Sequence, residues 1–221
     1  MMGAGNIILK LVPCLVTALT LSGCVGLFID KYGHVSADSK PVGEDGRAVF
    51  MPPDAPSISQ GFRPAPPGES VSGVHNGIDI FHASGTPVIA AASGTVISSY
   101  FEPFAGRRIK IDHGQDENGL YVRTGYFHLK KRLVKEGDKV IRGQQIGTLG
   151  MSGLLAGFPH LHFEVRVGED PAKGHEFKPM NPHRFWVNGV GVITCFDSTK
   201  EWPDTPFQTT YPIPCRGIVW K

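Results

Sequence analysis

Polar and hydrophobic residues alternate along PHLHFEVRV, the segment from Pro159 to Val167. Because successive side chains of a β-strand point to opposite faces, this pattern predicts a strand with one buried and one polar face. The apolar face would carry Leu161, Phe163, Val165 and Val167, and the polar face would carry His160, His162, Glu164 and Arg166. Two imidazoles on one face of an anchored strand could bind a metal, or they could simply lie on a polar surface.

Short patterns of the same kind, separated by turn residues, run through the middle of the chain. Gly94–Tyr100, Arg107–Asp112 and Leu120–Leu129 each favour a strand, and few segments repeat apolar residues with the period of a helix. The 28 glycines and 18 prolines add many turn formers. We therefore expect an all-β fold, mainly antiparallel and β-sandwich-like, with few or no long helices in the mature domain.

The first 24 residues differ from the rest of the chain. Lys10 is their only charged residue, and the apolar run Leu11–Leu21 is too short to span a bilayer but suits a secretory signal. The run ends in LSGC, which resembles the lipobox of bacterial lipoproteins, where the signal is cut before a cysteine that then carries lipid. We expect lipidation of Cys24; the alternative is an ordinary signal peptide with a chance cysteine. Val25 stands where an acidic residue is associated with inner-membrane retention, which favours the outer membrane, facing the periplasm.

Removal of this signal would leave two thiols that carry no lipid, Cys195 and Cys215. Outside the cytoplasm they could form a disulfide, which would stabilise the tail by about 3 kcal/mol in the chain-entropy model. The alternative is two free or separately buried thiols. The disulfide is favoured because four prolines make regular structure poor in this region: Pro203, Pro206, Pro212 and Pro214.

Length and charge bound the organisation of the chain. A chain of 221 residues, 41% of them hydrophobic, fits one globular domain with extensions. The 22 basic and 20 acidic residues nearly balance, so the sequence shows no large excess of positive charge that would indicate nucleic-acid binding. We expect a signal peptide over residues 1–23, a lipidated N-terminus and tether over 24–55, a folded domain over 56–186 and a tail over 187–221.

A histidine and a carboxylate lie four residues apart in VHNGIDIF. In an extended segment His75 and Asp79 would share one side, with Ile78 and Ile80 on the other. This pair suits zinc, although a local hydrogen bond at a turn is an equal alternative. Further along, Tyr126 and His128 should share a side by their two-residue spacing. The remaining histidines favour structural or surface roles: His82, His113, His175 and His183.

Taken in order, His75-x-x-x-Asp79, Tyr126-x-His128-Leu129 and His160-x-His162 resemble the lysostaphin-like, LytM-type zinc endopeptidases, which cleave peptide bonds in bacterial peptidoglycan. The resemblance covers about residues 56 to 186 and includes an SxGF motif, an IDHG turn, a GDKV/GQxIG segment and a closing NP motif. It implies a duplicated-hybrid-motif-like fold with a substrate groove. No swinging-arm carrier is expected, because no lysine sits at the required hairpin tip.

The resemblance implies that His75, Asp79 and His162 bind Zn²⁺ and that His128 and His160 are catalytic. Three protein ligands would leave a fourth zinc position for water, as in a catalytic site. A histidine can take up a proton or stabilise an oxyanion, and which of the two does which stays open.

Two other features of the site region carry expectations. We favour an exposed ion pair between Glu164 and Arg166 over a role for Glu164 in orienting an imidazole. Two loops depart from the familiar pattern of the family that the sequence resembles. In the loop before the histidine strand, which contains Leu155, Phe158 looks like an extra residue, and the turn QDENG is longer than usual. Both loops should rim the groove and affect which peptide is accepted.

We therefore expect an exported, lipid-anchored zinc endopeptidase that hydrolyses cross-links or stem peptides of peptidoglycan during cell-wall remodelling. The alternative is a non-catalytic peptidoglycan-binding protein or an activator of a cell-wall amidase. The metal-site residues are often missing in such relatives, whereas all five are present here. Expected partners are the peptidoglycan peptide, the membrane and other wall-remodelling proteins.

Overall fold

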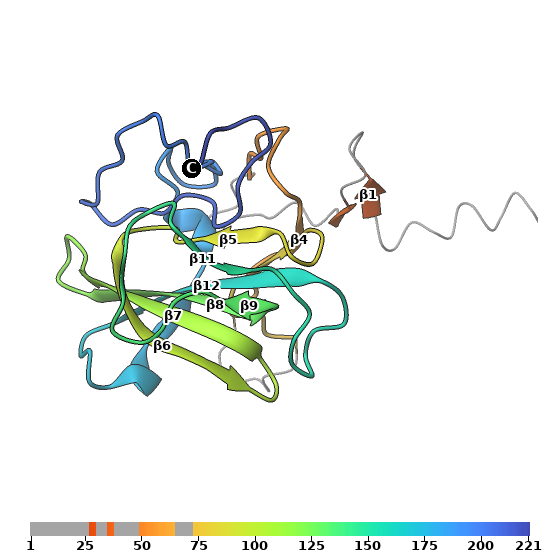
Figure 1. The fold of residues 1–221 in the computed structure, drawn as a ribbon. Coiled ribbons are helices and arrows are strands. Elements are labelled where there is room, and N and C mark those ends of the chain that lie inside the picture. The colour runs from red at the N-terminus through yellow and green to blue at the C-terminus, as the bar shows by residue number, and fades with distance from the viewer. Residues whose placement is uncertain (1–26, 30–34, 38–48, 65–72) are drawn as a thin grey trace, which may run out of the picture.

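The computed structural model describes residues 49–64 and 73–221 and the backbone of two short strands before them (Figure 1). Those strands, β1 (Leu27–Ile29) and β2 (Val35–Ala37), pair with each other. Cys24 and the expected signal peptide lie outside the described residues. None of the helices in the described part of the chain has the length and hydropathy of a membrane span.

An eight-stranded sheet dominates the fold, and all of its strand pairs are antiparallel. Its order is β10-β6-β7-β8-β12-β4-β3, with β13 paired to β12. The strands are β3 (Ile58–Gln60), β4 (Ile78–Phe81), β6 (Gly94–Glu102), β7 (Gly106–Gln115), β8 (Tyr121–Leu129), β10 (Lys139–Val140), β12 (His160–Gly168) and β13 (Lys178–Met180).

A second sheet of three antiparallel strands has the order β5-β11-β9. Its strands are β5 (Pro87–Ile89), β9 (Lys131–Arg132) and β11 (Gln145–Thr148). Val88 and Ile146 from this sheet share one hydrophobic core with Ile111 and Leu161 from the larger sheet. Within residues 49–64 and 73–221, the helical segments are two 3-10 turns, η1 (Gly174–Glu176) and η2 (Pro182–Arg184). The expected antiparallel all-β fold is confirmed.

Strand β12 lies between β8 and β4 in the larger sheet. Leu161, Phe163 and Val165 are fully buried, as the alternating pattern predicts. Burial of three large side chains on one face fixes the strand and leaves the opposite face free for polar residues. The core therefore sets the register of the residues that face the cleft.

The segment expected to be a tail packs onto the domain. Ile193, Tyr211 and Ile213 are buried in the shared core, and the expected disulfide between Cys195 and Cys215 is present. The residues that precede β3 pack against this C-terminal segment. The backbone N–H of Phe50 donates to Gly191 O at 2.8 Å, and the hydroxyl of Tyr211 donates to Pro56 O at 2.6 Å. Residues 49–57 and the C-terminal segment thus cover one side of the fold together.

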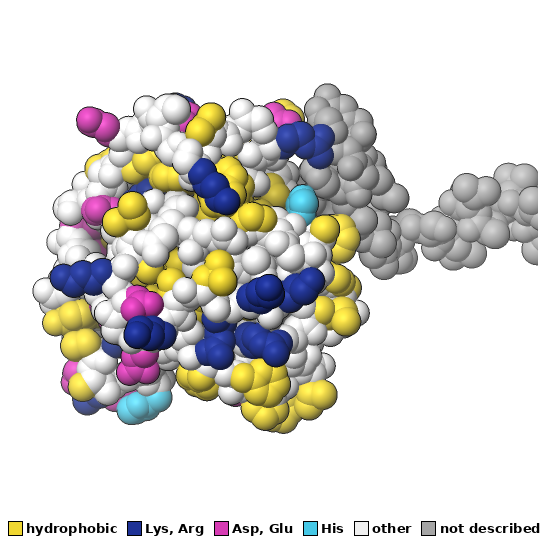
Figure 2. Space-filling model, in the orientation of Figure 1, with side chains coloured by type: hydrophobic (Ala, Val, Ile, Leu, Met, Phe, Trp, Pro, Cys, Tyr) yellow, Lys and Arg dark blue, Asp and Glu magenta, His cyan; other side chains and the backbone are white. Residues whose placement is uncertain are grey.

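Exposed hydrophobic side chains gather at one corner of the molecule. They lie at the lower right of Figure 2, over the turn between β6 and β7, where Phe101 and Phe104 are more than half exposed. The loop from Met151 to Phe158 adjoins this turn, because the N–H groups of Leu154 and Leu155 donate to Pro103 O and Phe104 O.

Candidate metal centre

A cleft of about 380 Å³ opens over the polar face of β12. All five residues proposed as zinc ligands or catalytic groups line it: His75, Asp79, His128, His160 and His162. They come from three strands and from the segment that precedes β4. The structure therefore brings together residues that are far apart in the sequence.

Backbone pairing places the two sides of the site opposite each other. Asp79 of β4 is the direct cross-strand partner of His162 of β12. His75 is held by two backbone hydrogen bonds with Arg63, each 2.9 Å long. Gly77 lies between His75 and Asp79 in the sequence, and a Cβ at this position would clash with Phe163 O. Only glycine allows this close approach of the segment to β12.

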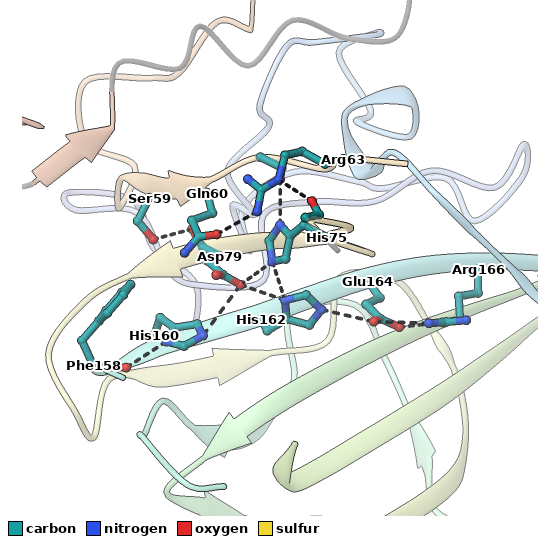
Figure 3. A network of polar contacts seen from close by, with 12 residues as sticks. Ser59, Gln60, Arg63, His75, Asp79, Phe158, His160, His162, Glu164 and Arg166 are labelled. Atoms are coloured by element: carbon teal, nitrogen blue, oxygen red, sulfur yellow. Dashed lines mark hydrogen bonds and ion pairs between the residues drawn. The ribbon is translucent and has the colours of Figure 1, made fainter. Parts of the chain in front are cut away.

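Three ligand atoms converge on one point (Figure 3). His75 Nε2 lies 3.1 Å from Asp79 Oδ1 and 3.0 Å from His162 Nδ1, and His162 Nδ1 lies 2.8 Å from Asp79 Oδ1. Ligands about 2.1 Å from a tetrahedral zinc are separated by about 3.4 Å. The observed separations come close to this value, so a small outward shift would accommodate the ion.

The outer nitrogens of both histidines fix which nitrogen faces the centre. His75 Nδ1 lies 2.7 Å from Gly61 O, which can only accept, so Nδ1 carries hydrogen and Nε2 presents a lone pair. His162 Nε2 lies 3.1 Å from Glu164 Oε1, so in the neutral ring Nδ1 presents a lone pair. Two lone pairs and the Asp79 carboxylate oxygen would repel one another unless a cation lies between them. The donor set therefore fits Zn²⁺.

The charge balance of the centre leads to the same conclusion. Burial opposes ionisation of Asp79, but hydrogen bonds with His162 and His75 hold its pKa well below the ordinary value. Burial also disfavours charge on His162, yet hydrogen bonds to Asp79 and Glu164 raise its pKa to about 9. The site thus stabilises one positive charge, for which a proton and a metal ion compete.

Two further histidines complete the cleft, and the ring of each is held by a backbone carbonyl. His128 Nδ1 donates to Ser152 O at 2.9 Å, and His160 Nδ1 donates to Phe158 O at 2.8 Å. Each Nε2 is thereby left as an acceptor. Burial lowers the pKa of His128 to about 4 despite the bond to Ser152. The two ring centroids are 4.7 Å apart, and His160 Nε2 lies 3.7 Å from Asp79 Oδ1.

Glu164 differs from its expected role as an exposed ion-pair residue. It is 6% exposed, and it accepts hydrogen bonds from both His162 Nε2 and Arg166 Nε, the latter at 2.6 Å. Burial opposes its ionisation, but these partners lower its pKa to about 2. The position of Glu164 two residues after His162 in the sequence was the signal that could have indicated this contact. Glu164 therefore orients a proposed ligand; the expected ion pair with Arg166 is present, but the expectation that Glu164 is exposed was wrong.

Tyr126 is also not where strand alternation predicts. It is fully buried in the core, and its hydroxyl accepts from the N–H of Ala91 at 2.9 Å. The alternation ends because His128 adopts a left-handed backbone, with φ of 59°. Phe127 and His128 consequently both line the cleft, while Tyr126 faces away from it.

The histidines expected to be structural or exposed behave accordingly. His113 Nδ1 donates to Ser93 O at 2.7 Å, and His82 Nδ1 lies 2.7 Å from the hydroxyl of Thr86. The other two are His183, which is buried and accepts from Trp186 Nε1, and His175, whose side chain is 82% exposed.

The two loops expected at the rim are placed differently. Leu155 and Phe158 line the cleft, and the Phe158 ring centroid lies 4.9 Å from that of His160. The QDENG turn instead lines a separate cavity through residues 116–118. It lies at the start of β8, whereas His128 lies near the end of that strand. The expectation that this turn rims the groove was wrong.

Residues 73–179 match the family model described as Peptidase family M23. Peptidoglycan DD-endopeptidase ShyA of Vibrio cholerae is 44% identical over 97 residues, which are 44% of this chain and 21% of the relative. Lysostaphin of Staphylococcus simulans is 39% identical over 175 residues, 72% of this chain and 34% of the relative. The chain thus spans well under half the length of these relatives.

Two solved structures are also similar. The catalytic domain of lysostaphin from Staphylococcus simulans is 33% identical, covers 57% of this chain and 88% of its own, and has a TM-score of 0.46. A zinc-containing peptidase from Vibrio cholerae is 31% identical, covers 70% of this chain and 44% of its own, and has a TM-score of 0.46. On the sequence matches, residues 73–179 form a domain of peptidase family M23.

Proposed function

We propose that this protein is a zinc-dependent endopeptidase that hydrolyses peptide bonds of bacterial peptidoglycan, in cross-links or stem peptides. The observation that carries the proposal is the convergence of His75 Nε2, Asp79 Oδ1 and His162 Nδ1 beside two further histidines, His128 and His160. Relatives named peptidoglycan DD-endopeptidase and lysostaphin support the substrate class.

In this proposal His75, Asp79 and His162 hold Zn²⁺, which would supply Lewis acidity that acidifies water and polarises a carbonyl. The residues of the chain do the rest. Nε2 of His128 or His160 accepts the proton of the attacking water and returns it to the leaving amine. The carbonyls of Ser152 and Phe158 keep Nδ1 of each ring protonated, so that Nε2 stays free for this transfer.

The decisive experiment incubates residues 25–221 with zinc and defined cross-linked muropeptides, with and without chelator. We expect new amino termini that disappear with chelator and in both His160→Ala and His162→Ala. Zinc content should persist in His160→Ala and fall in His162→Ala, and the exposed His175→Ala serves as the matched control. Cleavage that survives chelation would contradict the proposal. Binding without cleavage would favour the non-catalytic alternative.

We further propose that Cys24 is lipidated and holds the enzyme in the cell envelope, on the outer membrane facing the periplasm. Peptidoglycan-acting relatives support envelope action, and the LSGC motif supports the anchor. Metabolic labelling with a fatty acid should mark the wild type and not Cys24→Ser. Equal labelling of the two would refute lipidation at this residue.

We also propose that the peptidase domain spans residues 56–186.

A further inference from the structure

An apolar patch lies at the corner of the molecule described above, next to the rim of the cleft. It consists of Phe101 and Phe104 from the turn between β6 and β7, and of Leu154 and Leu155 from the loop before β12. These four side chains are 55 to 77% exposed. A group of large apolar side chains that water surrounds marks a surface that binds a partner.

The backbone holds the two halves of this patch together. The N–H groups of Leu154 and Leu155 donate to Pro103 O at 2.9 Å and to Phe104 O at 3.1 Å. Gly153 has a φ of 91°, and a Cβ there would meet the backbone of the facing turn. The apolar side chains are therefore displayed by a fixed backbone, which loses little conformational entropy when a partner binds.

Basic side chains stand directly beside the patch. The guanidinium carbon of Arg107 lies 5.9 Å from the ring centroid of Phe101. Arg107 is the cross-strand partner of Leu129, and the exposed residues Lys130 and Lys131 follow Leu129 in the chain. Figure 2 shows a group of Lys and Arg side chains next to the hydrophobic corner, on the side toward the centre of the molecule.

Negative charge is nearly absent from the segments that build this corner. Their one acidic residue is Glu102, within residues 98–111, 129–135 and 149–159. Its carboxylate accepts from the N–H groups of Phe104 and Ala105 at 2.9 and 3.0 Å, so it is directed at the backbone of its own turn. The corner is thus apolar and cationic, although the whole chain is nearly neutral.

We propose that this corner docks on an anionic lipid bilayer. The apolar side chains would enter the boundary of the hydrocarbon layer, and the cations beside them would meet the anionic headgroups. A substrate peptide does not account for the patch, because Leu155 is its only member that lines the cleft. The inference goes beyond the proposed function, and it does not require lipidation of Cys24.

Docking would place the cleft at the membrane surface. Ser152 and Phe158, whose carbonyls hold His128 and His160, belong to the same loop as Leu154. The enzyme would therefore act on wall peptides that lie close to the bilayer. This consequence, unlike the docking itself, rests on the proposed function.

The test measures sedimentation of residues 25–221, which lack the lipid anchor, with vesicles at low salt. We expect binding to an equal mixture of phosphatidylglycerol and phosphatidylcholine and much weaker binding to phosphatidylcholine alone. Arg107→Gln should lower the partition coefficient about fivefold, the effect of one cation near an anionic surface. Phe101→Ser and Phe104→Ser should each lower it about tenfold, because an apolar side chain no longer enters the bilayer.

Two matched controls lie at the opposite end of β6, where β10 pairs with Gly94 and Thr95. Ile141→Ser removes an apolar side chain that is 70% exposed, and Lys139→Gln removes an exposed cation. Both should leave the partition coefficient unchanged. Since all of the substituted side chains are exposed, circular dichroism should show a native fold in every variant.

Fluorescence of Phe104→Trp distinguishes insertion from adsorption. Lipids brominated on their acyl chains should quench this variant more than the wild type, whose three tryptophans lie at residue 186 or beyond. Absence of this extra quenching, or partition of the Phe101 and Phe104 variants equal to the wild type, would refute docking. Equal binding to neutral vesicles would overturn the assignment to an anionic bilayer. Self-association that is lost in the Phe variants, without vesicle binding, would show that the patch binds a second copy and would also refute the proposal.

Discussion

Substitution of Glu164 by glutamine tests whether this buried carboxylate supports the metal centre. Glu164 accepts one bond from His162 Nε2 and one from Arg166 Nε. Glutamine keeps the size of the side chain but has one acceptor oxygen, so its amide NH₂ must face one of the two donors. His162 then loses a charged acceptor, or Arg166 loses its partner. Either change disturbs the ring orientation on which a lone pair at Nδ1 depends.

The expected magnitude follows from the role of groups that orient a metal ligand. Loss of such a partner weakens metal binding by about 10- to 100-fold, or about 1.4 to 2.7 kcal/mol. Zinc affinity is measured by competition with a chromogenic chelator at neutral pH, and kcat/KM is measured at saturating zinc. Glu136→Gln, which neutralises an exposed carboxylate, is the matched control. If Glu164→Gln binds zinc as tightly as this control, Glu164 does not orient His162 in the way described.

Three further predictions follow from the structure. Gly77→Ala should abolish zinc binding or lower stability, because its Cβ would meet Phe163 O; circular dichroism with zinc titration checks this, and wild-type affinity would refute it. His113 should contribute a loss of stability of up to about 3 kcal/mol as the pH drops from 6.5 toward 4, because burial lowers the pKa of folded His113 to about 4, so that in this window His113 is protonated only in the unfolded chain. Urea unfolding should show a weaker pH dependence in His113→Asn, and an unchanged dependence would refute the assignment. Exchange of Leu155 and Phe158 for serine should alter preference across a peptide panel with zinc content intact, and an unchanged preference would count against a rim role.

The histidine strand could be predicted from the sequence because one of its faces is entirely apolar. The alternation from Pro159 to Val167 predicts β12 closely, since burial of Leu161 and Phe163 permits only one register. The convergence of His75 with His162 could not be derived from periodicity. It depends on pairing between segments 87 residues apart, and only the resemblance of the ordered motifs to a known family pointed to it.

The errors arose where side-chain position depends on a single backbone angle or on neighbouring strands. Tyr126 was placed with His128 because the alternation rule cannot foresee the left-handed backbone at His128. Glu164 was expected to be exposed because a strand pattern does not show what covers its polar face. The segment after residue 186 has little periodicity, yet Tyr211 and Ile213 complete the core through long-range contacts.

The polar face of β12 explains why the proposed functions depend on one another. His160, His162, Glu164 and Arg166 recur every second residue along the strand, so neighbours are about 7 Å apart. In our proposals they transfer a proton, bind zinc, orient the zinc ligand and neutralise that carboxylate, in that order. A slip of one residue in the pairing of β12 with β4 would turn all four to the core and bring Leu161 and Phe163 into the cleft. The buried face of this strand is therefore as necessary for the proposed chemistry as the histidines themselves, and substitutions there should impair zinc binding without touching a ligand.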